Sequence, residues 1–207
     1  QSGTSHYFGQ KFSKAYDIKF VTKNNTFEYA YQTSWGVSNR MIGALIMVHG
    51  DDNGLILPPK IAPRQVAIIK ATADEETNKL AEELNQKLQN ANITSYIDSS
   101  DKSFGFKLAE AEVNGIPVRI ELGKRDIANK LITVSRRDTL EKIQISFDTD
   151  IVEYIENLMN EIQNNLYNRA KSRRDSMTYH AYNLEEIKKI MDTQPGFIYA
   201  PWCGTEE

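Results

Sequence analysis

The feature that most constrains the fold is an alternation of strand and helix patterns between residues 60 and 148. Residues 65–70 (QVAIIK) form a short apolar run typical of a buried strand. A capping-box pattern at 72–75 then precedes leucines at helical spacing, which indicates an amphipathic helix. The patterns that follow indicate a strand, a helix and three strands, over residues 93–97, 104–113, 116–122, 131–134 and 143–147. This order predicts an α/β fold with a mixed five-stranded sheet and helices.

The first 59 residues have a different character, with many glycines and aromatic residues. Residues 27–32 are typical of a strand, and the apolar run 41–48 is too short for its periodicity to distinguish a helix from a strand. Residues 50–54 (GDDNG) form a strong turn signal, and 55–57 predict a short strand that a proline pair ends.

From Asp148 onward the pattern becomes helical. Asp148 or Thr149 can cap a long helix that has one apolar face and a polar, basic tail at 168–174. A shorter helix is expected at 182–191, and a strand that runs into a tight turn at 196–203. These elements predict a small α+β piece at the end of the chain.

Composition narrows the class of protein. The net charge of −3 argues against a nonspecific DNA binder, although basic residues cluster locally. Cys203 is the single cysteine, so a disulfide framework is excluded and a reducing, cytoplasmic location is expected. No apolar run reaches the roughly 18 residues needed to cross a bilayer, and the N-terminus lacks a signal-peptide pattern, so no membrane partner is expected.

Residues 33–45 are the most informative run. A strand of small residues leads through Gly36 to Arg40 at the start of an apolar segment. Glycine lets a flat ligand approach the backbone, and an arginine can stack on a purine and donate to phosphates. The same spacing also fits an ordinary strand, loop and helix with a surface arginine.

Residues 33–59 (TSWGVSNRMIGALIMVHGDDNGLILPP) closely resemble motif 3 and its continuation in prolyl-tRNA synthetases of the archaeal and eukaryotic type. Residues 1–18 (QSGTSHYFGQKFSKAYDI) resemble the proline-pocket loop of that family. Three later segments resemble family segments in the same order: GIPVRIELGKRD, VSRRDTLEK and APWCG. Ordered motifs over essentially the whole chain are far more specific than a single short pattern.

The resemblance implies a class II synthetase, which makes prolyl-adenylate from proline and ATP with Mg²⁺ and then transfers proline to tRNA(Pro). It implies that residues 1–59 are the C-terminal part of an antiparallel-sheet catalytic domain, that 60–165 are an anticodon-binding domain, and that 166–207 are a truncated C-terminal piece related to a zinc-binding domain. The full-length parent is expected to be a homodimer. Motifs 1 and 2 would lie upstream of Gln1, so this chain alone is expected not to activate proline.

The same resemblance assigns catalytic-site residues. Contacts to ATP fall on Gln1, Thr4, Ser38 and Arg40, and contacts to proline fall on His6, Trp35 and Gly36. Arg40 is the catalytic candidate, because a fixed cation stabilises the negative charge that builds on the α-phosphate. His6 also fits an ordinary turn histidine near a chain end.

Proline anticodons share two adjacent guanines, and a guanine needs both a basic group and a carboxylate to be recognised fully. The sequence offers that mixture in one region: Glu112, Arg119, Glu121, Arg125, Asp126, Arg136 and Arg137. Arg119 and Glu121 are two residues apart, so they share one face of a strand. The pattern alone also fits a salt-bridged solvent face. With the resemblance, Glu112, Arg119, Arg125, Asp126, Arg136 and Arg137 are the expected anticodon contacts, while the basic run 169–174 fits either RNA phosphates or a solvated helix end.

No metal site is expected in this chain. In many family members the residue matching Cys203 is the first of four zinc ligands, but a lone cysteine cannot build a tetrahedral site. A half-buried small residue is therefore the favoured interpretation of Cys203, which at most is a remnant of a zinc ligand. Asp51 and Asp52 fit a solvated turn, and His49 and His180 have no paired ligand nearby in the sequence.

Two other functions fit parts of the pattern. One is a stand-alone tRNA-binding or regulatory module with a synthetase-like fold and no catalysis. The other is a class II synthetase with the same domain order, such as the threonyl or glycyl enzyme. The TSH loop and the RRD segment favour the prolyl type over these synthetases.

Overall fold

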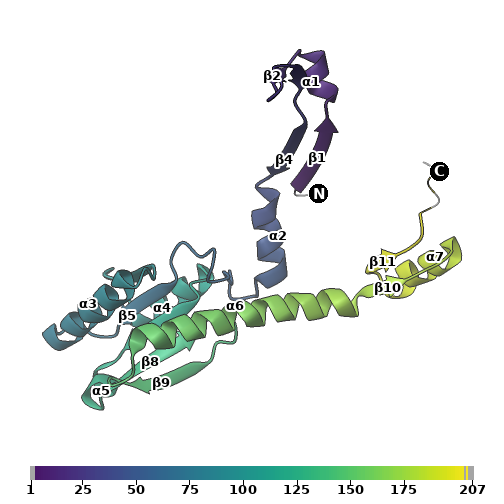
Figure 1. The fold of residues 1–207 in the computed structure, drawn as a ribbon. Helices are drawn as coiled ribbons and strands as arrows, with labels where there is room; N and C mark the ends of the chain where they lie inside the picture. Colours follow the sequence, from purple (N-terminus) through teal and green to yellow (C-terminus); the bar gives the residue numbers. More distant parts are fainter. Residues whose placement is uncertain (1–2, 203, 205–207) are drawn as a thin grey trace. The chain divides into compact units, whose positions relative to one another are not determined.

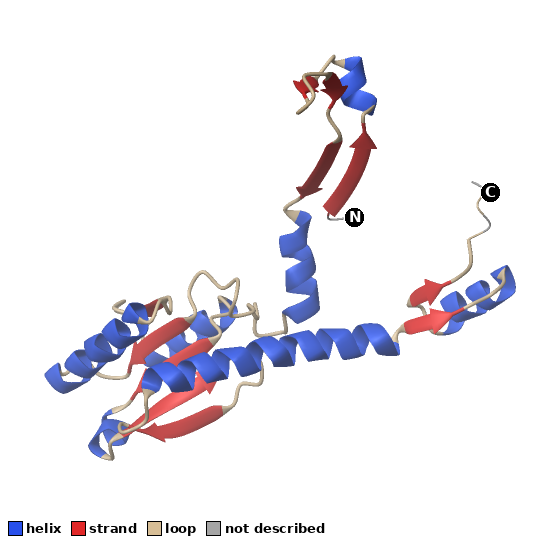
Figure 2. Cartoon of the chain, viewed as in Figure 1, coloured by secondary structure: helices blue, strands red, loops and turns tan. Residues whose placement is uncertain are grey.

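The computed structural model describes residues 3–202 and residue 204, so the predictions for Gln1 and Cys203 lie outside the described residues. The chain divides into two compact units, Gln1–Val48 and His49–Glu207, which are described separately below (Figures 1 and 2). The predicted domain boundaries after residues 59 and 165 stay a prediction.

The first unit consists of two antiparallel strand pairs and two helices. Its elements are β1 (Gly3–Gly9), α1 (Lys11–Ala15), β2 (Lys19–Val21), β3 (Phe27–Tyr29), β4 (Gln32–Val37) and α2 (Arg40–His49). Strand β1 pairs with β4, and β2 pairs with β3. The prediction of a single strand over 27–32 is wrong, because that segment is divided between β3 and the start of β4. The ambiguous apolar run over 41–48 lies in helix α2, which joins β4 as the strand-loop-helix pattern predicted.

This unit has almost no core of its own. Of its described residues only Ser13 is buried, where its hydroxyl donates to the carbonyl oxygens of Gln10 and Ala30. Large apolar side chains such as Trp35 and Met47 are instead about three-quarters exposed, at 75% and 77%. The strands and helix α2 therefore present apolar surfaces instead of enclosing a core.

The second unit is built on a mixed five-stranded sheet, as predicted. Its strands are β5 (Val66–Lys70), β6 (Ser95–Ile97), β7 (Val118–Leu122), β8 (Leu131–Arg136) and β9 (Lys142–Ser146), in the spatial order β6-β5-β7-β8-β9. Strand β5 is parallel to β6 and β7, whereas β7, β8 and β9 are antiparallel neighbours. Four helices accompany the sheet: α3 (Glu75–Asn90), α4 (Phe104–Val113), α5 (Lys124–Ala128) and α6 (Ile151–Ser176). The sequence pattern did not indicate the short helix α5.

Strand alternation separates two apolar layers. Val66 and Ile68 of β5 belong to the main core, together with buried residues of α3 and α6. Ala67 and Ile69, the alternate residues, pack in a smaller cluster with α4. Helices α3 and α6 therefore cover one face of the sheet, and α4 covers part of the other.

Side-chain caps start the two long helices, but not at the predicted residues. Helix α3 is capped by Asp74, whose carboxylate accepts from the backbone amide of Thr77, so the predicted capping box at 72–75 is wrong by two residues. The hydroxyl of Thr72 instead donates to Asp74, and these hydrogen bonds lower the pKa of Asp74 to about 2. Helix α6 is capped by Asp150 and not by Asp148 or Thr149.

The predicted strand over residues 55–57 is wrong, although the amides of Leu55 and Leu57 donate to the carbonyl oxygens of Val113 and Gly115 at the end of α4. Beyond α6 lie β10 (Thr178–His180), α7 (Leu184–Thr193) and β11 (Phe197–Tyr199). Strand β10, which the pattern did not indicate, pairs in parallel with β11. Gly196 is needed there, since a Cβ on it would lie 2.2 Å from the carbonyl oxygen of Met177. None of the described helices is both long and apolar enough to cross a membrane.

Substituting Leu88 with alanine tests the main core. Leu88 is fully buried beneath the sheet, so Leu88→Ala should destabilise the second unit by about 2–5 kcal/mol. Leu184→Ala, at a residue 73% exposed on α7, is the matched control and should change stability by less than about 0.5 kcal/mol. Urea unfolding followed by far-ultraviolet circular dichroism measures both. Similar losses for the two variants would contradict this core.

Candidate nucleic-acid interface

One face of the sheet carries a continuous polar surface, which we call the polar face. Strand register places its members opposite one another on three adjacent strands: Arg119 and Glu121 of β7, Thr133 and Ser135 of β8, and Lys142 and Gln144 of β9. The apolar residues between them, such as Ile120 and Val134, point to the main core on the opposite face. Because Arg119 lies beside Ala67, the polar face continues the α4 side of the sheet.

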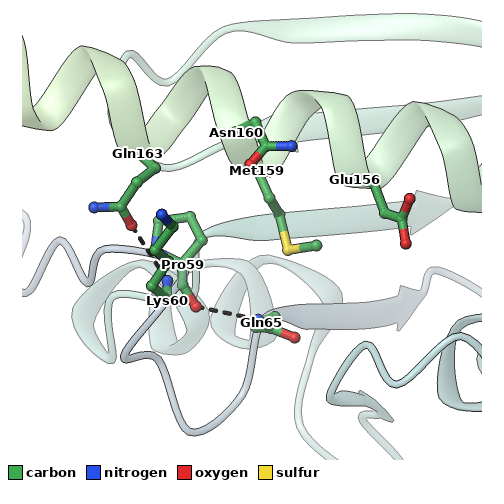
Figure 3. Close-up of a pocket in the computed structure, with 7 residues that line it drawn as sticks. All are labelled: Pro59, Lys60, Gln65, Glu156, Met159, Asn160 and Gln163. Carbon is green, nitrogen blue, oxygen red and sulfur yellow. Dashed lines mark hydrogen bonds between the residues drawn. The ribbon is translucent and has the colours of Figure 1, made fainter.

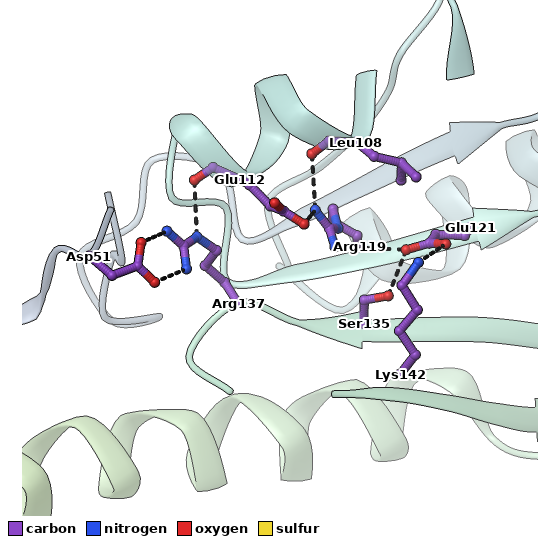
Figure 4. Close-up of polar contacts among 8 residues, drawn as sticks. All are labelled: Asp51, Leu108, Glu112, Arg119, Glu121, Ser135, Arg137 and Lys142. Atoms are coloured by element: carbon purple, nitrogen blue, oxygen red, sulfur yellow. Dashed lines mark hydrogen bonds and ion pairs between the residues drawn. The ribbon is translucent and has the colours of Figure 1, made fainter. Parts of the chain in front are cut away.

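Arg119 is at the centre of a buried polar network (Figure 4). Its side chain is only 5% exposed and donates to the Glu112 carboxylate at 2.5 Å and to the carbonyl oxygen of Leu108 at 2.9 Å. A second nitrogen of its guanidinium lies 3.8 Å from Glu121. Burying a charge is costly unless it is paired, and here two carboxylates and a carbonyl pair it.

The network reaches solvent on both sides of Arg119. Glu121 accepts from the hydroxyl of Ser135 at 2.6 Å and from the ammonium group of Lys142 at 2.8 Å. The side chain of Lys142 is 49% exposed and that of Glu112 is 27% exposed. A cation and a carboxylate are therefore accessible at opposite ends of one hydrogen-bonded row.

Helix α5 adds a carboxylate to this face. The two oxygens of Asp126 accept from the hydroxyl of Thr133 at 3.1 Å and from the amide of Gln144 at 3.0 Å. A carboxylate has about four acceptor positions, so Asp126 keeps capacity for a ligand. Arg125, its neighbour on α5, is exposed. The structure thus places Arg119 on the polar face and brings Glu112 and Asp126 into contact with residues of that face. Arg125 adjoins Asp126 in the sequence.

Arg136 lies on the other side of the sheet. It makes a two-point ion pair with Asp138, at 2.7 and 2.9 Å, and its guanidinium also lies 3.5 Å from Glu161 of α6. Burial opposes ionisation of Asp138, but the hydrogen bonds from Arg136 and Asn165 outweigh it and lower the pKa of Asp138. Alternation along β8 explains the placement, since Arg136 follows Ser135 by one residue.

Arg137 is also engaged within the protein. Its guanidinium donates to both oxygens of Asp51, at 2.8 and 2.6 Å, and to the carbonyl oxygen of Glu112 at 3.0 Å (Figure 4). The hydrogen bond from Arg137 lowers the pKa of Asp51. Asp51 is therefore more than the solvated turn residue that its sequence suggested. That Arg136 and Arg137 contact RNA bases stays a prediction. In this structure both guanidinium groups are paired with carboxylates of the protein.

The predicted catalytic residues lie in the first unit on β1, β4 and α2. Thr4 pairs with Gly36 and His6 pairs with Ser34, so Thr4, His6 and Gly36 share a face. Trp35 pairs with Ser5 and lies on the opposite face. A Cβ on Gly36 would meet nothing within 4 Å, which leaves room for a flat group. Ser38 precedes α2, and Arg40 is exposed in its first turn.

Within residues 3–202 and 204, no group of three or more His, Cys, Asp or Glu residues is placed to hold a metal ion. The predicted absence of zinc stays a prediction. An open pocket of about 270 Å³ lies between residues 59–65 and α6, where Gln163 accepts from the amide of Lys60 and Gln65 donates to Pro59 (Figure 3). Two polar side chains of its lining, Gln65 and Gln163, are thus already hydrogen-bonded within the protein.

Sequence reasoning missed four members of the polar face: Thr133, Ser135, Lys142 and Gln144. A signal for them exists, because polar residues alternate with isoleucine and valine in both β8 and β9. Using that signal requires the register of the β8–β9 pair, which joins Ser135 to Lys142.

Replacing two of the predicted anticodon arginines should separate a structural role from a binding role. Arg119→Met removes the buried partner of Glu112 and Glu121, so it should destabilise the fold by about 3 kcal/mol. Arg125→Met, at an exposed site, should cost less than about 0.5 kcal/mol. Chemical denaturation of both variants gives the comparison, and equal stability of the two would refute the network described for Arg119.

Comparison with known proteins agrees with this architecture. Residues 65–158 match the family model described as "Anticodon binding domain". The chain is 47% identical over 207 residues to the proline–tRNA ligase of Mesoplasma florum, covering 100% of this chain and 43% of that protein. It is 50% identical over 205 residues to the proline–tRNA ligase of Clostridium novyi, covering 99% of this chain and 42% of that protein.

A solved structure supports the same relationship. The crystal structure of prolyl-tRNA synthetase from Cryptosporidium parvum complexed with L-proline and AMP superposes with a TM-score of 0.88 at 36% identity. That match covers 100% of this chain and 45% of the solved chain. The chain thus spans less than half the length of the curated relatives that it matches. With this identity along its whole length and an anticodon-binding domain within it, the chain corresponds to a part of prolyl-tRNA synthetases that makes up about 43% of their length.

Proposed function

We propose that this chain is part of a proline-tRNA ligase and that its α/β domain binds the anticodon of tRNA(Pro). The observation that carries the proposal is the polar face. Its accessible groups are the half-exposed cation of Lys142, the partly buried carboxylates of Glu112 and Asp126, and the exposed Arg125 of α5. Guanine presents acceptors at N7 and O6 and donors at N1 and N2, so it requires this pairing of groups.

Within this site we assign the carboxylate role to Asp126 and Glu112 and the cationic role to Arg125 and Lys142. The two carboxylates are held by hydrogen bonds from Thr133, Gln144 and Arg119 before any RNA arrives. Groups fixed in advance lose less conformational entropy when a ligand binds. Arg119 then holds the Glu112 carboxylate in place. Because Arg119 is buried under α4, it contacts a base only if α4 moves.

The first unit supplies the ligase part of the proposal. Thr4, Ser38 and Arg40 would contact ATP, and His6 and Gly36 would contact proline, as the family resemblance implies. Trp35, the third proline contact that the resemblance implies, lies on the opposite strand face from His6, so its role stays a prediction. The open space beside Gly36 and the exposed guanidinium of Arg40 are compatible with a nucleotide. Bound ATP and Mg²⁺ would supply the activated phosphate, and Arg40 would stabilise the charge on it.

The remaining assignments concern the whole protein. We propose a homodimer and a cytoplasmic location, the latter because a single cysteine suits a reducing compartment. The archaeal and eukaryotic type is proposed from the motif 3 and proline-pocket segments. Zinc is not assigned to this chain.

Binding of anticodon stem-loops tests the RNA-binding part. Fluorescence anisotropy should show that changing either shared guanine of the tRNA(Pro) anticodon to adenine weakens binding by about tenfold, since one lost base contact costs roughly 1–3 kcal/mol. Asp126→Asn should reduce this discrimination, because an amide replaces one acceptor oxygen with a donor. The control Asp175→Asn alters an exposed carboxylate on α6. Equal affinity for all three RNAs would overturn the proposal.

Proline-dependent exchange between ATP and pyrophosphate tests the ligase part. In a protein that contains this chain within the length typical of its relatives, Arg40→Ala should lower exchange about 10²–10³-fold, the usual loss for one charge-stabilising donor. Lys23→Ala, in the exposed turn between β2 and β3, is the control. Absence of exchange in the wild-type protein would instead favour a non-catalytic tRNA-binding module.

A further inference from the structure

Residues 51–57 lie along the C-terminal end of α4 and form a segment that we call the strap. The strap follows α2 directly in the chain. The amide of Leu55 donates to the carbonyl of Val113 at 3.0 Å, and that of Leu57 donates to Gly115 at 3.2 Å. Ile56, between them, is buried in the main core. The strap is thus fixed by its backbone to the end of α4 and to Gly115 just after it, and by a side chain to the core.

Two glycines make this contact tight. Gly54 has φ +131°, and a Cβ there would lie 2.5 Å from the Cα of Val113. Gly115 has φ +70°, and a Cβ there would lie 2.7 Å from the Cβ of Leu55. Both positions require glycine, because an L side chain would clash with backbone or side-chain atoms. The end of α4 therefore cannot move without moving the strap.

Arg137 fastens the strap to α4. Its side chain is 2% exposed and holds the Asp51 carboxylate at 2.6 Å and the Glu112 carbonyl oxygen at 3.0 Å. The carboxylate of the same Glu112 accepts from Arg119. Glu112 of α4 thus connects the two regions (Figure 4). Its backbone carbonyl binds Arg137, which holds the strap, and its carboxylate binds Arg119 of the polar face.

We propose that the strap is a coupling element, in which Arg137 is a positioning residue that links RNA binding at Glu112 to the chain segment leaving α2. This inference rests on the proposed RNA-binding function. An RNA base that engages the Glu112 carboxylate stabilises one arrangement of the last turn of α4. Because that turn supplies the acceptors for Leu55 and Arg137, and Gly115 just after it supplies the acceptor for Leu57, the strap becomes more stably attached. Such coupling is reciprocal, so loosening the strap weakens RNA binding by the same factor.

Amide hydrogen exchange in the 207-residue chain tests the coupling. Binding of the tRNA(Pro) anticodon stem-loop should slow exchange of the strap amides Leu55 and Leu57 by about fivefold or more, the lower range of ordinary coupling. The amides of α7 serve as an internal reference. RNA that binds while the strap amides exchange at an unchanged rate would overturn the coupling and leave the RNA-binding function intact. RNA that does not bind would refute the proposed function, and the coupling with it.

The variant Asp51→Asn tests reciprocity. Asparagine can still accept from the amide of Asn53 and keep the turn, but it lacks the charge that Arg137 pairs with. We expect it to lose the RNA-dependent slowing and to bind RNA about fivefold more weakly. Asp52→Asn, the exposed neighbour in the same turn, should behave like the wild-type protein. Wild-type affinity in Asp51→Asn would contradict the proposal, and the wild-type exchange measurement decides the question even if this variant unfolds.

Discussion

Strand β7 organises the α/β domain because its two faces have opposite chemical character. Val118, Ile120 and Leu122 fill the main core, while the alternate residues Arg119 and Glu121 carry charges on the other face. All five residues are buried, so each charge must find partners within the protein. The surrounding elements supply them: α4 provides Glu112 and a carbonyl oxygen, β8 provides Ser135, and β9 provides Lys142.

The same requirement shapes the proposed binding surface. A charge network that is satisfied internally leaves its outer members in fixed positions, and Glu112 and Lys142 are the members that solvent reaches. Asp126 is fixed in the same way from helix α5. Rigid donors and acceptors suit the recognition of a base by its edge, where geometry decides between guanine and adenine. The stability of the sheet and the selectivity of the surface thus depend on the same side chains.

The two units of the chain differ in how complete their cores are. The second unit encloses buried side chains from four strands, β5, β7, β8 and β9, and from several helices, whereas the described part of the first unit buries only Ser13. Exposed apolar side chains such as Trp35, Val37 and Met47 lie in the first unit, over which the chain also aligns with its relatives. The contrast agrees with a chain that spans 43% of the length of such a relative.

The sequence by itself determined the order of the main elements, the mixed sheet and the family, because apolar periodicity and ordered motifs are local properties. It also offered Glu112, Arg119 and Asp126 as one set, and the fold places them on or beside one face of the sheet, while their contact with RNA stays a prediction. Tertiary structure decided which charged residues share a face: register and alternation placed Arg136 against α6 instead, and revealed Lys142 as a partner of Glu121. The pairing of Asp51 with Arg137 joins residues 86 positions apart. No local pattern encodes such a contact, since it depends on how the strap packs on the end of α4.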